Sequence, residues 1–167
     1  MVKILTLILS ISLLIACSFS SDNQKLITNL PQHKIDQKSH ATSYAATIQT
    51  YSGRIHKDYN VNNFIAGVND WYLKRILLSA EQIKQSLYQG SHGSNIYAYY
   101  SGVLFASALQ QNFNKLNPNC WKYIEQQSVV QGIYDAMRDL QTQKVRSLND
   151  DYFIKGTEEV LTLCTTK

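Results

Sequence analysis

The hydrophobic residues of this chain recur mostly at three- and four-residue steps, the spacing of one face of an α-helix. The pattern is clearest over residues 60–88, where it predicts one long amphipathic helix capped by Asn60 or Asn62. Its apolar positions are Val61, Phe64, Ile65, Val68, Trp71, Tyr72, Ile76, Ile83 and Leu87. Because no segment alternates convincingly with the two-residue period of a strand, the pattern predicts an all-α fold.

Breaks in the pattern divide the rest of the chain. Gly90-Ser91-His92-Gly93 ends the first helix, and Ser94 is the expected N-cap of a second helix over residues 95–116. A third helix is predicted from about Cys120 to residue 140, and a last one from Ser147 and Asp150 to residue 164. We therefore expect a helical domain at 60–167, preceded by a weakly helical or irregular lead-in at 34–59. The expected fold is a compact bundle of four to five helices whose short connections favour antiparallel neighbours.

The beginning of the chain has the layout of an export signal. Lys3 precedes an uncharged apolar run of about 12 residues, which fits a signal peptide and is shorter than the roughly 20 residues that span a bilayer. The run ends in Leu14-Ile15-Ala16-Cys17, which resembles the lipobox of bacterial lipoproteins. The resemblance implies a signal peptide at 1–16, a lipid such as palmitate on Cys17 and a lipidated flexible tether at 17–33. A conventional secretory signal with an incidental cysteine is the alternative.

The lipobox also implies a cellular location. The expected location is the bacterial cell envelope, with the protein anchored by lipid. Ser18 follows Cys17, and by analogy with enteric sorting this residue favours the outer membrane, with the domain facing the periplasm.

Composition favours one folded domain. Hydrophobic residues make up 44% of the chain and tyrosine occurs 11 times, whereas disordered chains are poor in aromatic residues. The formal net charge of +4 includes Lys3 of the signal, and the remaining charges are mixed. This balance gives no indication of a nucleic-acid partner.

Three cysteines are present, and the lipobox accounts for one of them. Cys120 and Cys164 then form an even pair in an oxidising compartment, at two helix ends that antiparallel packing would bring together. A disulfide between them would stabilise the fold by about 4 kcal/mol in the chain-entropy model. Two buried free thiols are the alternative, and a metal site lacks further His or Cys ligands at suitable spacing.

No spacing indicates catalysis. All four histidines are expected in the tether or in loops, exposed to solvent: His33, His40, His56 and His92. Glu158 and Glu159 are adjacent, so on a helix they point about 100° apart and cannot face each other as an acid pair. We therefore expect no enzymatic activity, no cofactor and no metal.

A lysozyme-like peptidoglycan hydrolase is the enzymatic alternative. Such an enzyme needs a buried glutamate near a second acid. Glu81, Glu125 and Asp70 are the acids considered, and they lie on or beside predicted polar faces.

Tyrosines cluster around the turn at residues 90–93. Tyr88 precedes the turn, and Tyr97, Tyr99 and Tyr100 begin the next helix. Tyrosine combines a large rigid area with a polar tip, which suits protein interfaces. The candidate partner-binding residues are Tyr88, His92, Tyr99 and Tyr100. The alternative is that about half of the tyrosines belong to the core.

Several short runs in the second half of the chain are similar to the Tai/Rap immunity proteins of type VI secretion systems. They are Tyr99-Tyr100-Ser101-Gly102-Val103, Cys120, Val129-Val130 with Ile133, and Glu158-Glu159-Val160-Leu161 before Cys164. This chain departs from the family in having Trp121 where a proline usually follows the middle cysteine, and in lacking additional cysteines. The resemblance implies a small helical periplasmic protein that binds and neutralises a secreted effector.

Secretin pilotins share the layout of a lipoprotein with a small helical, disulfide-bearing domain. That likeness rests on architecture alone. The sequence therefore predicts a lipid-anchored protein that binds a protein partner, either an effector or a secretion component, without catalysis. A structural envelope lipoprotein of a secretion system is a further alternative.

Overall fold

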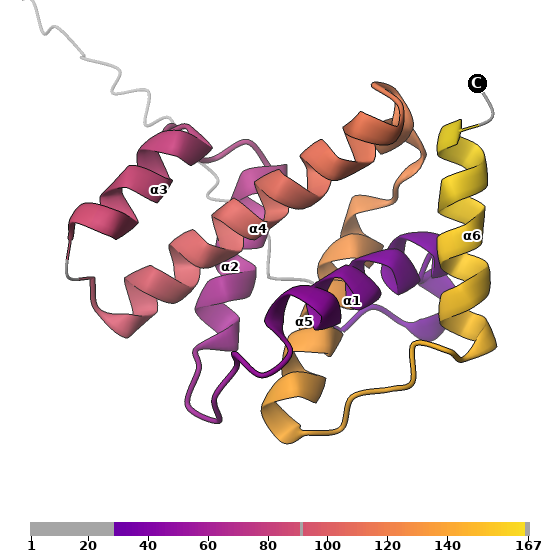
Figure 1. The fold of residues 1–167 in the computed structure, drawn as a ribbon, viewed down its shortest axis with the longest axis horizontal. Helices are drawn as coiled ribbons and strands as arrows, with labels where there is room; N and C mark the ends of the chain where they lie inside the picture. The colour runs from indigo at the N-terminus through magenta and orange to yellow at the C-terminus, as the bar shows by residue number, and fades with distance from the viewer. Residues whose placement is uncertain (1–28, 91, 166–167) are drawn as a thin grey trace, which may run out of the picture.

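A computed structural model describes residues 29–90 and 92–165 (Figure 1). Every regular element in these ranges is helical, and the elements follow one another as η1 (Gln32–Lys34), α1 (Gln37–Tyr51), α2 (Val61–Tyr72), α3 (Ala80–Gln89), α4 (Ser94–Leu116), η2 (Cys120–Tyr123), α5 (Gln126–Thr142) and α6 (Asp151–Thr165). The expected all-α bundle is confirmed. The signal peptide, Cys17 and the tether up to residue 28 lie outside the described residues.

The long helix expected over residues 60–88 is two helices, α2 and α3, so the described bundle has more helices than expected. The chain leaves α2 where the Arg75 N–H donates to the Asp70 carbonyl oxygen at 2.8 Å, with Lys74 in the left-handed region at φ 57°. Ser79 then caps α3 in a reciprocal capping box with Gln82. Ile76 lies between the two helices, one helical turn after Tyr72 and two turns before Ile83, so the apolar spacing continues across the break.

Helices α2 and α4 pack at very short range. A Cβ atom added at Gly102 would overlap the carbonyl oxygen of Phe64, and one added at Gly67 would overlap that of Tyr99. Glycine therefore allows the two backbones to touch. The two helices run parallel, because α3 carries the chain back toward the start of α2 before α4 begins (Figure 1).

Helix α1 lies against α5 and α6 and belongs to the core. At the start of α1, the Asp36 N–H donates to Ser128 Oγ at 2.9 Å and the Glu125 N–H donates to Ser39 Oγ at 2.8 Å. These bonds place the N-termini of α1 and α5 side by side, so this pair also runs parallel. Neither pair is consecutive in the chain, so the expectation of antiparallel neighbours, which rests on short connections, does not extend to them. The lead-in expected at 34–59 thus contains a buried helix.

A disulfide joins Cys120, at the start of η2, to Cys164 near the end of α6, with the two Cα atoms 4.9 Å apart. The expected pairing is confirmed. Both cysteines are buried in the larger of two apolar clusters, which α2, α4, α5 and α6 share. The bond therefore ties the last helix to the centre of the molecule.

Candidate protein-binding surface

Three of the four candidate residues are in ring contact where α3 meets α4: His92, Tyr99 and Tyr100. Tyr88 lies near the end of α3, His92 follows it, and Tyr99 and Tyr100 lie in the first turns of α4. The Tyr100 ring contacts both neighbours, with centroids 5.6 Å from Tyr99 and 6.2 Å from His92. We call this region the tyrosine surface and define it by six residues: Tyr88, His92, Ile96, Tyr97, Tyr99 and Tyr100.

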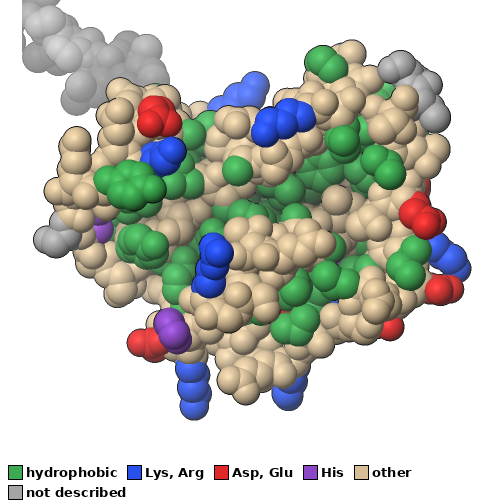
Figure 2. Space-filling view, viewed as in Figure 1, with side chains coloured by type: hydrophobic (Ala, Val, Ile, Leu, Met, Phe, Trp, Pro, Cys, Tyr) green, Lys and Arg blue, Asp and Glu red, His purple; other side chains and the backbone are tan. Residues whose placement is uncertain are grey.

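Exposure divides the tyrosine surface into a base and exposed tips. Tyr99 and Tyr100 are half-buried, whereas Tyr88 is 81% exposed and Tyr97 52% exposed. Ile96 is exposed beside them, and the sequence analysis missed it because helical spacing had placed it on the apolar face. Figure 2 shows hydrophobic side chains gathered over α3 and the first part of α4. Tyr99 and Tyr100 are therefore boundary residues, and an interface role of the exposed tyrosines stays a prediction.

Hydrogen bonds fix the base of this surface. The Tyr99 hydroxyl donates to Asp70 Oδ2 at 2.8 Å, and Arg75 Nη1 lies 3.7 Å from Asp70 Oδ1. Burial, together with the Asp70 carboxylate, raises the pKa of Tyr99. His92 Nε2 donates to the Ser86 carbonyl oxygen at 2.9 Å, which holds the loop against α3. The aromatic rings are thus held in place before any partner binds.

Two hollows lie beside the exposed tips. One, of about 340 Å³, is lined by Asn63, Asn95, Ile96, Tyr99 and Tyr100. The other, of about 440 Å³, has Arg54, His56, Asp58, Tyr59, Asn60, His92, Ser94 and Tyr97 around it. Burial raises the pKa of Tyr59 in the second hollow to about 12, so this phenol stays neutral. The surface is rich in aromatic rings and side-chain amides, a composition typical of protein-contacting sites.

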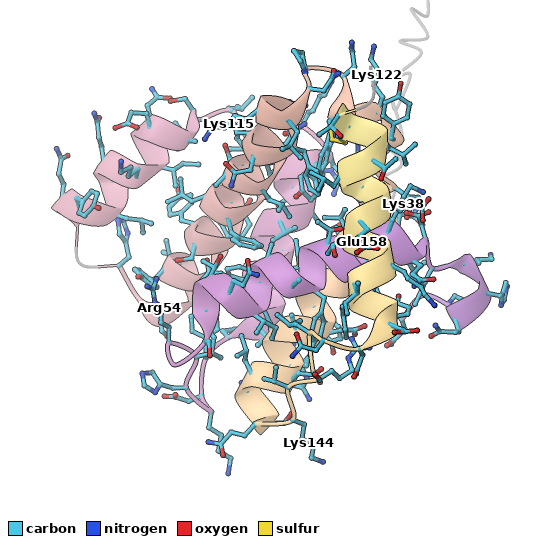
Figure 3. All side chains as sticks on the ribbon, turned by 45° about the vertical axis from the view of Figure 1, so that its right-hand side comes forward. Lys38, Arg54, Lys115, Lys122, Lys144 and Glu158 are labelled. Atoms are coloured by element: carbon cyan, nitrogen blue, oxygen red, sulfur yellow. A yellow bond between two sulfur atoms is a disulfide. The ribbon has the colours of Figure 1, made fainter. Side chains whose placement is uncertain are left out.

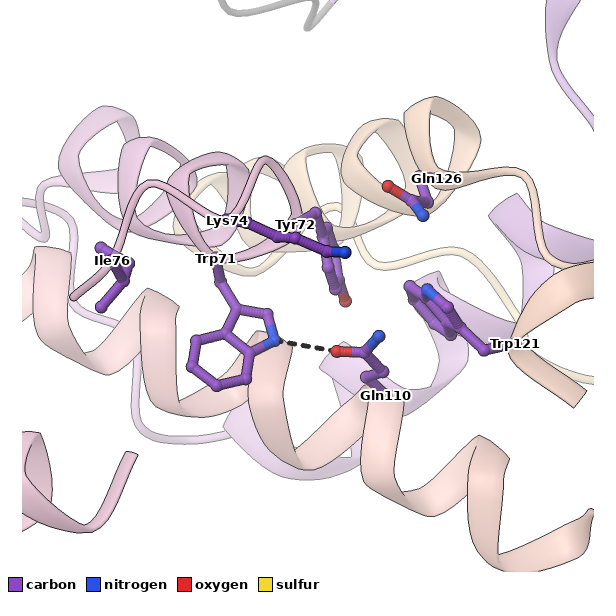
Figure 4. A pocket seen from close by; sticks show the side chains of 7 residues that line it. All are labelled: Trp71, Tyr72, Lys74, Ile76, Gln110, Trp121 and Gln126. Atoms are coloured by element: carbon purple, nitrogen blue, oxygen red, sulfur yellow. Dashed lines mark hydrogen bonds between the residues drawn. The ribbon is translucent and has the colours of Figure 1, made fainter. Parts of the chain in front are cut away.

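A separate hollow of about 400 Å³ lies at the other end of α2. It is lined by Trp71, Tyr72, Lys74, Ile76, Gln110, Trp121 and Gln126 (Figure 4). Trp71 Nε1 donates to Gln110 Oε1 at 3.0 Å, and the Tyr72 and Trp121 rings lie 5.1 Å apart. Sequence reasoning had assigned Trp71 and Tyr72 to the core. No spacing rule would have joined them to Trp121 and Gln126.

The expectation that His40 is a solvent-exposed loop residue is wrong. His40 lies in α1 and is 2% exposed. Its Nε2 atom is 2.9 Å from Asp135 Oδ2, and its Nδ1 atom is 3.1 Å from the Tyr152 hydroxyl. Both ring nitrogens are therefore occupied, and the group joins α1 to α5 and α6. The weak apolar pattern of α1 hid this role, because the helix also buries Ser39, Ser43 and Thr47.

The acids considered for a hydrolase have structural partners or face solvent. Asp70 accepts the Tyr99 hydrogen bond, and Glu125 caps α5 by accepting from the backbone N–H groups of Gln127 and Ser128. Glu125 is also exposed to solvent, as are Glu81, Glu158 and Glu159. Within residues 29–90 and 92–165, no group of three or more His, Cys, Asp or Glu is placed to hold a metal ion.

Comparison with known proteins gives the family. A family described as uncharacterised lipoprotein matches residues 33–166, from η1 onward. The chain belongs to this lipoprotein family. A protein of Haemophilus influenzae, whose printed name is uncharacterized protein, is 52% identical over 145 residues, which cover 87% of this chain and 82% of the relative. No solved structure matches the chain.

The family makes this chain a lipid-anchored protein of the cell envelope. None of the helices in the described part of the lipoprotein combines the length and apolar character needed to cross a bilayer.

Proposed function

We propose that this lipoprotein binds a protein partner through the tyrosine surface and performs no catalysis. One observation carries the proposal. Tyr88, Ile96 and Tyr97 are all exposed near the junction of α3 and α4, and Ile96 shares a hollow with Tyr99, whose hydroxyl is bonded to Asp70. Large apolar side chains that gather on a surface beside polar hollows are typical of interaction sites.

Order in the base supports a binding role. Tyrosine side chains have few rotatable bonds, so fixing them on a partner costs little conformational entropy. The Asp70–Tyr99 bond and the ring contacts of Tyr100 lower that cost further, because they hold the base in one arrangement. The exposed rings of Tyr88 and Tyr97 supply apolar area to a partner.

The absence of catalysis remains part of the proposal. It is supported by the state of the candidate groups, since both nitrogens of His40 are engaged and the carboxylates of Asp70 and Glu125 bind hydrogen-bond donors of the protein itself. A general acid or base must instead reach a substrate proton.

The resemblance to immunity proteins suggests a secreted effector as the partner. The lipoprotein would neutralise this effector at the periplasmic side of the outer membrane. A secretion component, as for a pilotin, is the second partner class. Both are proteins, and both would be bound at the same surface.

In-cell photocrosslinking tests the proposal on the full-length lipidated protein. A photoreactive phenylalanine derivative is placed at Tyr88 or Tyr97, and at Leu161 on α6 as the control, because Leu161 is 52% exposed like Tyr97. We expect one discrete protein adduct from positions 88 and 97 and none from 161. Mass spectrometry of that adduct identifies the partner as an effector or a secretion component.

Two outcomes would contradict the proposal. Adducts of equal yield from all three positions, or no protein adduct from 88 and 97, would remove the binding role of the tyrosine surface. Peptidoglycan cleavage by the purified protein would refute the absence of catalysis and favour the hydrolase alternative.

A further inference from the structure

The connection between α2 and α3, residues 73–79, presents leucines to the solvent. Leu77 is 99% exposed, and Leu73 and Leu78 are also exposed. Ile76 points inward and lines the hollow beneath the connection. The side chains of Leu77 and Leu78, which follow it, point toward the solvent instead. Leu77 therefore has almost no contact within the protein, and the partly exposed Leu73 and Leu78 lie in the same short segment.

Basic residues accompany these leucines. Lys74 and Arg75 belong to the same connection, and Lys115 and Lys122 lie at the same end of the molecule, opposite the end that carries Arg54 and Lys144 (Figure 3). One hollow joins the connection to η2. Lys74 and Ile76 line it on one side and Trp121 on the other. In the described part of the chain neither Lys74 nor Lys122 forms an ion pair.

Acids on the neighbouring elements offset only part of this charge. Asp70 lies 3.7 Å from Arg75, and Glu125 is engaged in capping α5. Glu81 is exposed at the start of α3, where Lys84 lies one turn further on. The connection and its surroundings thus combine apolar tips with a surplus of lysine and arginine, as interfacial membrane-binding segments do.

The short length of chain between the lipid on Cys17 and the folded domain favours a lipid bilayer as the binding partner of the exposed leucines. The Leu30 N–H is bonded to Gln131 Oε1 on α5, so the folded domain begins at that point. Lipid on Cys17 would leave residues 18–29 between the bilayer and the domain, and a chain of this length spans at most about 45 Å when fully extended. An anchored domain therefore stays within reach of phospholipid headgroups.

We propose that residues 73–79 form a membrane-contact site for an anionic phospholipid surface. Leu73, Leu77 and Leu78 enter the interfacial layer. Lys74, Lys115 and Lys122 contact lipid phosphates, and the exposed Lys74 side chain extends over the mouth of the hollow (Figure 4). The proposal rests on the lipid anchor. Tyr88 lies at the opposite end of α3, whereas Arg75 reaches the Asp70–Tyr99 pair at the base of the tyrosine surface.

Tryptophan fluorescence tests the contact, because both tryptophans of the chain, Trp71 and Trp121, line the hollow beside the connection. The full-length lipidated protein is reconstituted in vesicles of phosphatidylethanolamine and brominated phosphatidylglycerol, since bromine quenches nearby indole rings. Leu77→Asp places a charge on the most exposed leucine. Val145→Asp is the matched control, because Val145 is exposed and follows Lys144 at the opposite end.

We expect wild type and Val145→Asp to be quenched equally and Leu77→Asp to lose most of the quenching. Replacing the anionic lipid with brominated phosphatidylcholine should also lower the quenching of the wild type. Equal quenching of all three proteins would mean that the tether alone brings the domain near lipid, and would overturn the proposal. Crosslinked dimers that Leu77→Asp abolishes, in place of lipid quenching, would assign the leucines to a second copy of the chain and also overturn it.

Discussion

Asp36 shows how one side chain sets both the start of a helix and a dependence on pH. It caps α1 by accepting from the Ser39 N–H at 3.0 Å, and Lys38 Nζ lies 2.6 Å from its other oxygen. Partial burial acts to raise its pKa, but the hydrogen bonds from Lys38 and Ser39 outweigh burial and leave the pKa below the ordinary value of 3.8. The carboxylate is therefore favoured in the folded protein.

Asp36→Asn tests this charge, because asparagine also caps helices well. A lowered pKa gives the folded state extra stability that is fully present above the pKa of the unfolded chain and is lost as pH falls through the folded value. We expect the wild type to be more stable than the variant at pH 7 and the difference to close below about pH 4. Urea unfolding over a pH series measures it, with the exposed Asp151→Asn as control. A difference that does not change with pH would contradict the assignment.

Helix pairing depends on glycines at the contacts between helices. Gly102 and Gly67 bring α2 against α4, and Gly132 meets Ser43 and His40 on α1. A glycine in a helix lowers its stability by about 1 kcal/mol relative to alanine, so its presence in a helix interior is explained by the close approach it permits. The short distance between α2 and α4 in turn positions Tyr99, whose carbonyl oxygen touches Gly67.

Gly102→Ala should lower the free energy of unfolding by about 1–3 kcal/mol, because the added methyl group would overlap the Phe64 carbonyl oxygen and force α2 and α4 apart. Chemical denaturation measures the change. Gly93→Ala is the control, since a Cβ at Gly93 meets no atom within 4 Å and the cost of a changed N-cap is below about 1 kcal/mol. Equal stability of the Gly102→Ala variant and the wild type would show that the two backbones do not touch.

At the scale of the whole molecule, the Cys120–Cys164 bond limits how far the chain can separate on unfolding. It joins residues 44 positions apart and closes a loop that contains α5 and most of α6. In the chain-entropy model, a crosslink of this span lowers the entropy of the unfolded chain rather than strengthening contacts in the folded one.

Reduction of this disulfide should lower the free energy of unfolding by about 4 kcal/mol. Urea unfolding of the lipidated protein with and without reductant measures the loss. A Cys120→Ser/Cys164→Ser variant should be insensitive to reductant and about as stable as the reduced wild type. If reductant left the wild type unchanged, the bond would have no part in stability.

Local signals determined the helical class, the position of α4 and the break at residues 90–93, because these follow from apolar spacing and from glycine and proline. The cysteine pair followed from counting, once Cys17 was assigned to lipid. The candidate residues Tyr88, His92, Tyr99 and Tyr100 were found because they lie close together in the sequence. The break between α2 and α3 was missed, since Ile76 continues the helical spacing from Tyr72 to Ile83 although it lies in the connection between the two helices.

Only the tertiary structure decided which helices pair, which tyrosines face the solvent and what His40 does. Parallel pairing of α1 with α5 and of α2 with α4 depends on contacts between residues far apart in the chain, such as Asp36 with Ser128 and Gly102 with Phe64. Such contacts form where the surfaces of two helices are complementary in shape. The spacing of residues along one helix does not indicate which other helix it packs against. The sequence by itself therefore determined the lipid anchor, the helical class and the disulfide, whereas packing decided the two surfaces.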